Sequence, residues 1–177
     1  EPMPLESISA LDTDTELLDS LVEKGLARQA DSDHYDVHDL VREFLTRSMD
    51  DSLRQELHNN AKEWYRTRLE TAADRIEYIH HLNESGGTDD LAEVLSSEGH
   101  NLVKSGHTEL LGILRTLERE GFDSRSWCII HELRGDILSI QGRWDEAERE
   151  YDAAIPIARK NSMAEELSRL LSARADI

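Results

Sequence analysis

Apolar residues recur at helical spacing along most of the chain, and short polar segments separate these stretches. The first helix is predicted by apolar positions that share one face, namely Leu17, Leu18, Leu21 and Val22. Thr13 and Glu16 have the spacing of a capping box at its start. Gly25 suits its end, because glycine readily adopts the left-handed backbone that terminates helices.

A short β-hairpin and a second amphipathic helix are predicted next. The segment 26–30 has the character of a strand, 31–34 that of a turn, and 35–37 that of a return strand. The helix that follows is expected to bury one side, made of Val37, Val41, Phe44, Leu45 and Met49. The order helix, hairpin, helix is that of the later part of a winged-helix unit.

From Asp50 onward the pattern predicts helices and no strand. One helix starts at Asp50-Asp51-Ser52, with an apolar face of Leu53, Leu57, Ala61, Trp64 and Tyr65. After this helix, further helices are predicted at 75–83, 89–103, 107–120, 127–141 and 144–160. Gly86 and Gly87 end the helix at 75–83. We therefore predict a mainly α fold with two parts, a partial winged-helix segment with a connecting helix at 1–71 and antiparallel helical hairpins forming an α-α superhelix at 72–177.

The last predicted pair of helices carries a repeat pattern. The residues concerned are Gly135, Leu138, Gly142, Trp144, Ala147, Tyr151 and Ala154. Their spacing resembles the tetratricopeptide repeat, which places small residues where two helices touch and aromatic residues in the gaps. On this resemblance Gly135 and Ala147 allow close approach and Gly142 forms the turn. His131 and Arg159 depart from the usual tryptophan and proline, so an ordinary antiparallel helical hairpin is the alternative.

A second recurrence supports a repeat array. Arg134-Gly135-Asp136-Ile137 returns 40 positions later as Arg174-Ala175-Asp176-Ile177, a period longer than the typical ~34 residues. The chain then stops inside the first helix of the next repeat, which is therefore expected to be truncated. Because the chain also begins without an initiator methionine, we expect it to be a fragment of a longer protein.

The candidate chemistry lies at His38 and Asp39, where the predicted hairpin meets a helix. The segment Leu11–Met49 resembles the winged-helix segment of STAND-class signalling NTPases, including the NB-ARC relatives, in its leucine-rich helix 17–26 and in Val37-His38-Asp39-Leu40-Val41-Arg42. The resemblance implies that His38 faces the β-phosphate of ADP held by a preceding NTPase domain. It also implies that Asp39 orients the backbone at the helix start, where an acid suits the helix dipole. The residues alone allow His38 to be a helix cap or a core histidine instead.

Charge bears on the kind of partner. The net charge is −18, with 38 acidic residues against 16 arginines and 4 lysines, and the acids are spread along the chain. DNA-binding surfaces need basic residues to neutralise phosphates, but the predicted helix 15–24 has one lysine against Glu16, Asp19 and Glu23. Dispersed carboxylates with scarce lysine favour a halophilic source, because the Debye length falls to ~3 Å at 1 M salt.

The sequence disfavours an enzyme, a metal site and a membrane protein. Gly99–Ser105 imitates the end of a phosphate-binding loop, but Val103 occupies the position of its glycine. His80 and His81 are adjacent and would point about 100° apart on a helix, so no metal is predicted. The spacing of Asp31, Asp33 and Asp36 hints at calcium but indicates a turn.

The remaining features fit a cytoplasmic setting. No apolar run approaches the ~20 residues that cross a bilayer, and the start of the chain lacks a secretory signal. The lone Cys128 cannot form an internal disulfide and is expected to be a small buried hydrophobe.

Taken with the resemblance, these features predict a regulatory and protein-interaction fragment of a STAND-type signalling ATPase, linked to transcriptional or signal regulation. The winged helix would act as a nucleotide-state switch, and the repeats would bind a protein or peptide. The fragment itself would hold no cofactor, whereas the parent would bind ADP or ATP in an NTPase domain upstream in the same chain. A stand-alone helical-repeat scaffold and a winged-helix DNA-binding regulator are the alternatives.

Overall fold

A computed structural model describes residues 3–4, 15–29 and 34–177, and the chain divides into two compact units, Glu1–Glu70 and Thr71–Ile177. The sequence places the division after residue 71. The elements of the first unit are β1 (Met3–Pro4), α2 (Thr15–Glu23), β2 (Ala27–Gln29), β3 (His34–Val37), α3 (Asp39–Ser48) and α4 (Asp51–Arg66). Those of the second are α5 (Ala72–Glu84), α6 (Thr88–Lys104), α7 (Leu110–Thr116), α8 (Ser124–Ile140), α9 (Trp144–Lys160) and α10 (Ala164–Ala175).

The first unit contains a small antiparallel sheet with the strand order β1-β3-β2. The predicted hairpin is present as β2 and β3, in a register that pairs Ala27 with Val37 and Arg28 with Asp36. The edge strand β1 was not expected, because two residues carry no alternating pattern. Pro4 is compatible with this position, since an edge strand tolerates a missing backbone N–H.

Gly25 ends α2 as the sequence predicts. Its φ is +67°, its N–H donates to Val22 O at 2.9 Å, and the N–H of Leu26 donates to Leu21 O at 2.9 Å. This pair of bonds is the Schellman arrangement, which satisfies carbonyls that the helix itself leaves open. At the other end of the helix, Thr13 and the side chain of Glu16 lie outside the described residues.

The prediction that Phe44 lies on the buried side of α3 is wrong. Phe44 is 68% exposed and Leu40 is 70% exposed, whereas Val37, Val41 and Met49 are half-buried. Leu40 and Phe44 are four residues apart and therefore lie on one side of α3, which is exposed. The side chain of Leu45 lies outside the described part of the chain.

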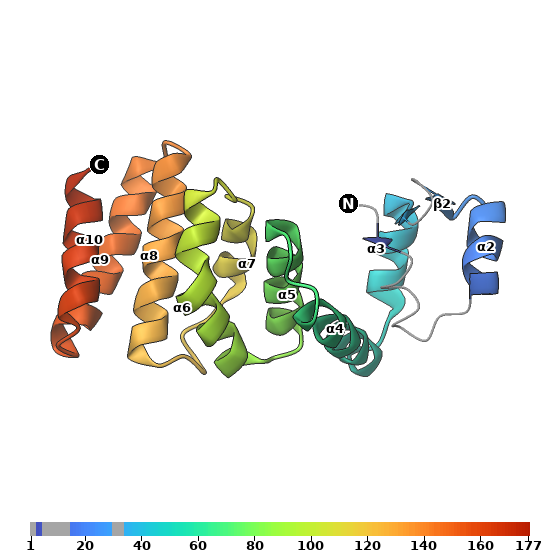
Figure 1. Cartoon of the computed structure of the whole chain (residues 1–177), viewed down its shortest axis with the longest axis horizontal. Coiled ribbons are helices and arrows are strands. Elements are labelled where there is room, and N and C mark those ends of the chain that lie inside the picture. The colour runs from blue at the N-terminus through green and yellow to red at the C-terminus, as the bar shows by residue number, and fades with distance from the viewer. Residues whose placement is uncertain (1–2, 5–14, 30–33) are drawn as a thin grey trace. The chain divides into compact units, whose positions relative to one another are not determined.

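The second unit is a row of antiparallel helices, which confirms the predicted helical-repeat fold (Figure 1). The hairpin of α8 and α9 packs against α6 and α7 on one side and against α10 on the other. Among the described residues, no helix has both the length and the apolar content that crossing a membrane requires. The largest fully buried side chains of this core include Ile79, Leu82, Leu95, Leu114, Leu133, Ile137, Tyr151 and Leu170.

Left-handed residues end four helices of the second unit. Gly86, Gly106 and Gly142 follow α5, α6 and α8 with φ of +76°, +90° and +72°, and Ser162 follows α9 with φ of +56°. Each donates its N–H into the last turn of its helix. Ser162 thus occupies a position that favours glycine, since an L side chain in left-handed backbone costs roughly 1–2 kcal/mol.

Replacing Ser162 by glycine is expected to raise the free energy of unfolding by about 0.5–1 kcal/mol, because the relief of strain exceeds the added freedom of the unfolded chain. Urea denaturation of the purified chain measures the change. The reverse substitution, Gly142→Ser, is the matched control and should lower stability by a similar amount. Equal stability of Ser162→Gly and the parent would show that Ser162 is unstrained.

The helix α7 is shorter than the sequence predicts, ending at Thr116 instead of continuing to residue 120. Leu117 is extended, with ψ of 130°. The guanidinium of Arg134, from α8, donates to the carbonyls of Leu114 and Leu117. A partner distant in the sequence therefore satisfies the end of α7, which local pattern cannot reveal.

Candidate functional site

His38 lies between β3 and α3 and caps the helix. Its N–H donates to Leu26 O at 3.2 Å, and its carbonyl accepts from the N–H groups of Val41 and Arg42. Its Nδ1 accepts from the N–H of Leu40 at 3.3 Å. The backbone of His38 is thus tied to Leu26, just before β2, on one side and to the first turn of α3 on the other.

This cap selects one tautomer of the His38 imidazole. When Nδ1 accepts a hydrogen bond, the proton of the neutral ring resides on Nε2. The side chain is exposed, so Nε2–H is a donor on the surface of the first unit. A helix N-terminus also favours anions, because its first N–H groups lack intrahelical partners.

Asp39 follows at the first position of α3 and is almost fully exposed, at 94% of its side chain. Its Oδ1 lies 3.8 Å from Nη1 of Arg42, one turn further along. The N–H of Leu40 donates to the His38 ring, and those of Val41 and Arg42 donate to the His38 carbonyl. Among the described residues, His38 is therefore the acceptor for these N–H groups at the start of α3. An acid at this position still interacts favourably with the helix dipole.

Asp36 organises this junction, and the sequence did not reveal it. Arg28 donates to Asp36 Oδ2 from Nε at 3.1 Å and from Nη2 at 2.8 Å. Arg42 donates to Asp36 Oδ1 and to Val37 O, both at 3.3 Å. The contacts join β2, β3 and α3 around His38. A cross-strand pair between Arg28 and Asp36 could have been found only with the register of the hairpin in hand.

These contacts also bear on the calcium alternative for the acidic turn. Both carboxylate oxygens of Asp36 face guanidinium groups, which makes them ion-pair partners. Asp31 and Asp33 lie outside the described residues.

In the second unit, Gly135 lets Tyr151 pack directly on α8. A Cβ at Gly135 would lie 2.5 Å from Tyr151 Cε1, far inside van der Waals contact. The Tyr151 hydroxyl donates to Asp136 Oδ1 at 2.8 Å. Ala147, Ala154 and Leu138 are fully buried around this contact, and Gly142 forms the turn between α8 and α9.

Trp144, one of the residues of the repeat pattern, is 61% exposed and does not lie in the core. It occupies the first position of α9, and Ile140, at the last position of α8, is also exposed. The turn around Gly142 places both residues at the tip of the hairpin. Trp127, by contrast, is half-buried, with the guanidinium of Arg134 5.2 Å from its ring centroid.

His131 replaces the usual tryptophan of the repeat with a polar contact. Its Nδ1 lies 2.6 Å from Glu150 Oε2 on α9. Its ring meets that of Trp127 edge to face, with 5.0 Å between centroids. A hydrogen bond and an aromatic contact therefore take over the bridging role of a large apolar side chain.

A buried carboxylate joins the first helices of successive hairpins. Glu132 on α8 is 3% exposed and accepts from Arg169 of α10 at 2.8 and 3.1 Å. His100 Nε2 of α6 lies 3.4 Å away. Burial acts to raise the pKa of Glu132, but the neighbouring His100 and Arg169 outweigh it and hold the pKa below its usual value.

Asp136, one turn further along α8, has the opposite shift. Burial raises its pKa, and this effect together with the nearby Glu132 exceeds the lowering by the Tyr151 hydrogen bond. Burial and the Asp136 carboxylate in turn raise the pKa of Tyr151 well above its usual range. The pKa values of these two carboxyls on α8 are thus shifted in opposite directions.

The recurring arginines make corresponding contacts. Arg134 of α8 reaches back to the carbonyls at the end of α7. Arg174 of α10 reaches back to Glu148 and Asp152 of α9, at 3.2 and 2.8 Å. In both cases the arginine contacts the second helix of the preceding hairpin, so the 40-residue recurrence in the sequence corresponds to a structural one.

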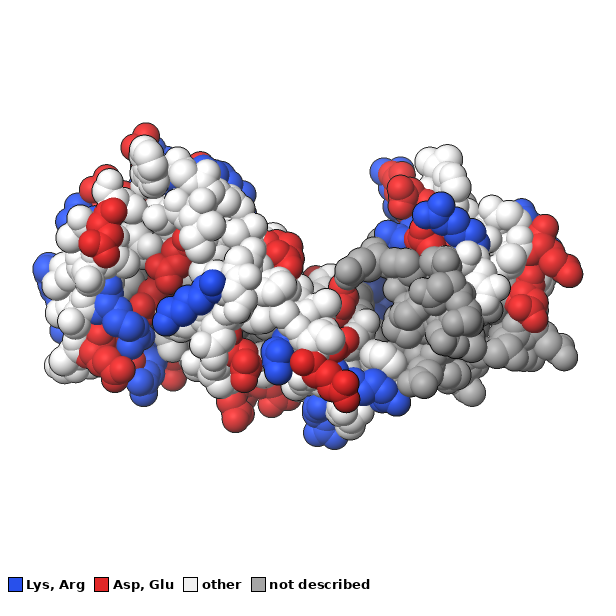
Figure 2. Space-filling view, turned by 45° about the horizontal axis from the view of Figure 1, so that its top comes forward, with Lys and Arg blue, Asp and Glu red and all other residues white. Residues whose placement is uncertain are grey.

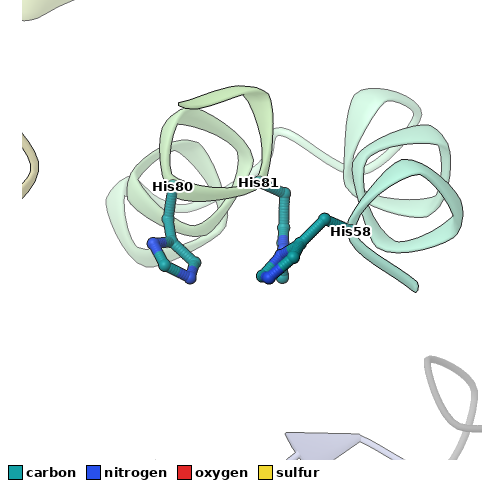
Figure 3. Close-up of side chains that lie close together, drawn as sticks. All are labelled: His58, His80 and His81. Atoms are coloured by element: carbon teal, nitrogen blue, oxygen red, sulfur yellow. The ribbon is translucent and has the colours of Figure 1, made fainter. Parts of the chain in front are cut away.

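Gly99 and Cys128 have packing roles. Gly99 lies inside α6, where a Cβ would meet Leu133 Cδ1 at 2.6 Å; this segment is helical and has no loop to cradle a phosphate. Cys128 is buried as predicted, and burial raises the pKa of its thiol to about 11. His80 and His81 leave α5 at adjacent positions, but their rings come together, with centroids 5.1 Å apart and one ring nitrogen of each within 4.8 Å of the other (Figure 3). The expectation that adjacent positions on a helix keep the two rings apart is therefore wrong.

No protein-family model and no curated protein matches the chain. Among solved structures, it is similar to the crystal structure of a Signal Transduction ATPase with Numerous Domains (STAND) protein with a tetratricopeptide repeat sensor, from Pyrococcus horikoshii, with a TM-score of 0.50 and 17% sequence identity. The similarity covers 99% of this chain and 32% of that protein, so the chain spans about a third of its length. The chain therefore shares the helical-repeat fold found in a STAND protein with a tetratricopeptide repeat sensor.

Proposed function

We propose that this chain is a regulatory part of a STAND-type signalling ATPase, in which the first unit responds to bound nucleotide and the helical unit binds a protein or peptide. The observation that carries the proposal is the cap at α3. Through Nδ1, His38 is held in the tautomer that presents Nε2–H at a helix N-terminus. The similarity in fold to a STAND protein supports the same reading.

The first unit supplies contacts and no catalytic step. Nε2–H of His38 donates to the β-phosphate of ADP, which an upstream NTPase domain of the same chain holds. The ion pairs of Arg28 and Arg42 with Asp36 keep the strand-to-helix junction rigid. Loss of the phosphate contact on nucleotide exchange releases this unit, which is the switch.

The helical unit supplies the surface that binds a protein. Stacked helical hairpins form extended surfaces suited to peptides and proteins. The contacts of Glu132 with Arg169 and His100 tie α6, α8 and α10 together, so these helices act as one surface. Figure 2 shows acidic and basic side chains next to one another on one face of this unit, which favours a polar partner selected by charge pattern.

Replacing His38 by alanine in the full-length parent is expected to weaken ADP binding by about tenfold and to raise basal signalling, because a hydrogen bond to a charged group contributes about 1.5–3 kcal/mol. His38→Asn is the informative companion. Asparagine can cap a helix but lacks the imidazole Nε2–H.

Weakened ADP binding in both variants supports the phosphate contact. Weakening in His38→Ala alone would assign His38 to capping only, and unchanged ADP affinity and output in both would refute the switch. Thermal unfolding of the 177-residue chain with each substitution separates loss of folding from loss of contact.

A plain helical-repeat scaffold is the second candidate, favoured by the separate compactness of Thr71–Ile177. The gene sequence upstream distinguishes the two, because the switch requires a phosphate-binding loop and an acidic metal-binding strand before residue 1. DNA binding is not proposed, since Asp19 and Glu23 of α2 are exposed acids that would repel phosphates.

A further inference from the structure

The second unit contains a small pocket at one end of its helical row. Its volume is about 180 Å³, and it lies between the end of α5, the start of α6 and the segment that joins α7 to α8. The volume corresponds to about six waters at about 30 Å³ each, the scale of one amino acid side chain. All residues from Thr71 to Ile177 are described, so the lining is complete.

The walls of the pocket are apolar and its rim is acidic. Leu82, Leu91, Leu117 and Phe122 line it and are at most 8% exposed. Glu118 and Glu120 are the charged lining residues, and both are exposed. An aliphatic stem suits such walls, and a cationic head suits such a rim, because long basic side chains bury their methylene groups while the charge stays near water.

Asn83, a neutral residue of the lining, adds a hydrogen-bond acceptor to the pocket. Both amide protons of Asn83 are used, toward Glu84 Oε1 and Thr116 Oγ1, each at 3.1 Å. Its Oδ1 is therefore presented as an acceptor beside the pocket.

Arg119, which lies between Glu118 and Glu120 in the sequence, forms its hydrogen bonds with the backbone of the following turn. Arg119 donates to the carbonyls of Phe122 and Asp123. Its guanidinium thus stabilises the turn before α8, and Glu118 and Glu120 define the charge of the rim.

We infer that this pocket binds a lysine or arginine side chain of a partner polypeptide. The helical unit carries 21 acidic and 12 basic side chains, so its negative potential attracts a basic segment. The pocket then holds one basic side chain of that segment. This site is separate from His38 and from the Glu132 cluster, and it stands whether or not the chain responds to nucleotide.

The inference is tested on the ¹⁵N-labelled 177-residue chain by titration with Nα-acetyl-lysine amide and Nα-acetyl-arginine amide. Amide signals of Gly86, Gly87, Thr88 and Glu118 are expected to shift in a saturable manner. Nα-acetyl-norleucine amide has the same stem as lysine without the charge, and should bind at least about fivefold more weakly.

The double variant Glu118→Gln/Glu120→Gln is expected to weaken lysine binding by about fivefold. Glu93→Gln/Asp145→Asn removes the same charge at exposed sites on α6 and α9, outside the pocket lining, and should leave binding near that of the parent. Equal binding of norleucine and lysine would overturn the inference. Equal loss in the two double variants, or shifts spread over the whole acidic surface, would also overturn it, because both mean non-specific attraction.

Discussion

Replacing Glu132 by glutamine is expected to lower the free energy of unfolding by about 3 kcal/mol at pH 7, whereas Asp136→Asn, one turn away, should leave it unchanged or raise it. The glutamine removes the counter-ion of Arg169 from a buried site, and breaking one side of a buried ion pair costs about 3–5 kcal/mol. We expect the low end, because the Arg169 side chain is 37% exposed. At Asp136, an asparagine still accepts from Tyr151 and removes a charge that burial disfavours.

Glu132 and Asp136 should also differ in how they make the free energy of unfolding depend on pH. The folded pKa of Glu132 lies below its ordinary value, so its contribution to stability is complete at neutral pH and is lost as the pH falls through the folded pKa. The folded pKa of Asp136 lies above its ordinary value, so its ionisation opposes folding at neutral pH and protonation relieves this cost. Glu132→Gln should therefore flatten the loss of stability below about pH 4, and Asp136→Asn should steepen it.

Urea denaturation at several pH values measures both effects. The two substitutions remove one negative charge each from the same helix, so a difference between them reports the sites and not the net charge. Equal losses of stability at neutral pH would contradict the ion pair that the structure gives Glu132.

Replacing Gly135 by alanine is expected to lower the free energy of unfolding by about 2 kcal/mol, although alanine favours helices over glycine by roughly 1 kcal/mol. The new methyl would lie within 2.9 Å of three atoms of the Tyr151 ring. That ring is 1% exposed and its hydroxyl is bonded to Asp136, so it cannot move aside without losing packing or the hydrogen bond.

Gly112→Ala is the matched control, because Gly112 is exposed in α7 and a Cβ there meets nothing within 4 Å. It should raise stability by about 0.5–1 kcal/mol. Opposite shifts of the urea midpoint at constant slope are the expected result. A stabilising Gly135→Ala would mean that Tyr151 does not pack on α8 as described.

Features that depend on local sequence were predictable. Gly25, Gly86 and Gly142 end their helices because left-handed backbone is a property of the residue itself. The bounds of α9 agree with the prediction, since the apolar spacing there is regular and a turn precedes it. The repeat-like spacing from Gly135 to Ala154 likewise predicted the close approach of α8 and α9 at Gly135 and Tyr151.

Features that depend on distant partners were not predictable. The end of α7 is set by Arg134, 17 residues beyond Leu117. Glu132 is buried in contact with Arg169, 37 residues away; from the sequence alone it is one acid among 38. At the candidate site, the cap by His38 was one of the alternatives, but the Arg28–Asp36–Arg42 contacts needed the register of the hairpin.

The backward reach of Arg134 and Arg174 has a consequence for how such a chain can change in length. Each arginine binds the second helix of the hairpin before it. Arg169 of α10 likewise reaches back to Glu132 of α8, so removing the downstream helix would leave that buried carboxylate without its guanidinium. A row of helices built on such backward contacts can lengthen by whole units, provided that each added unit brings an arginine to the carboxylate before it.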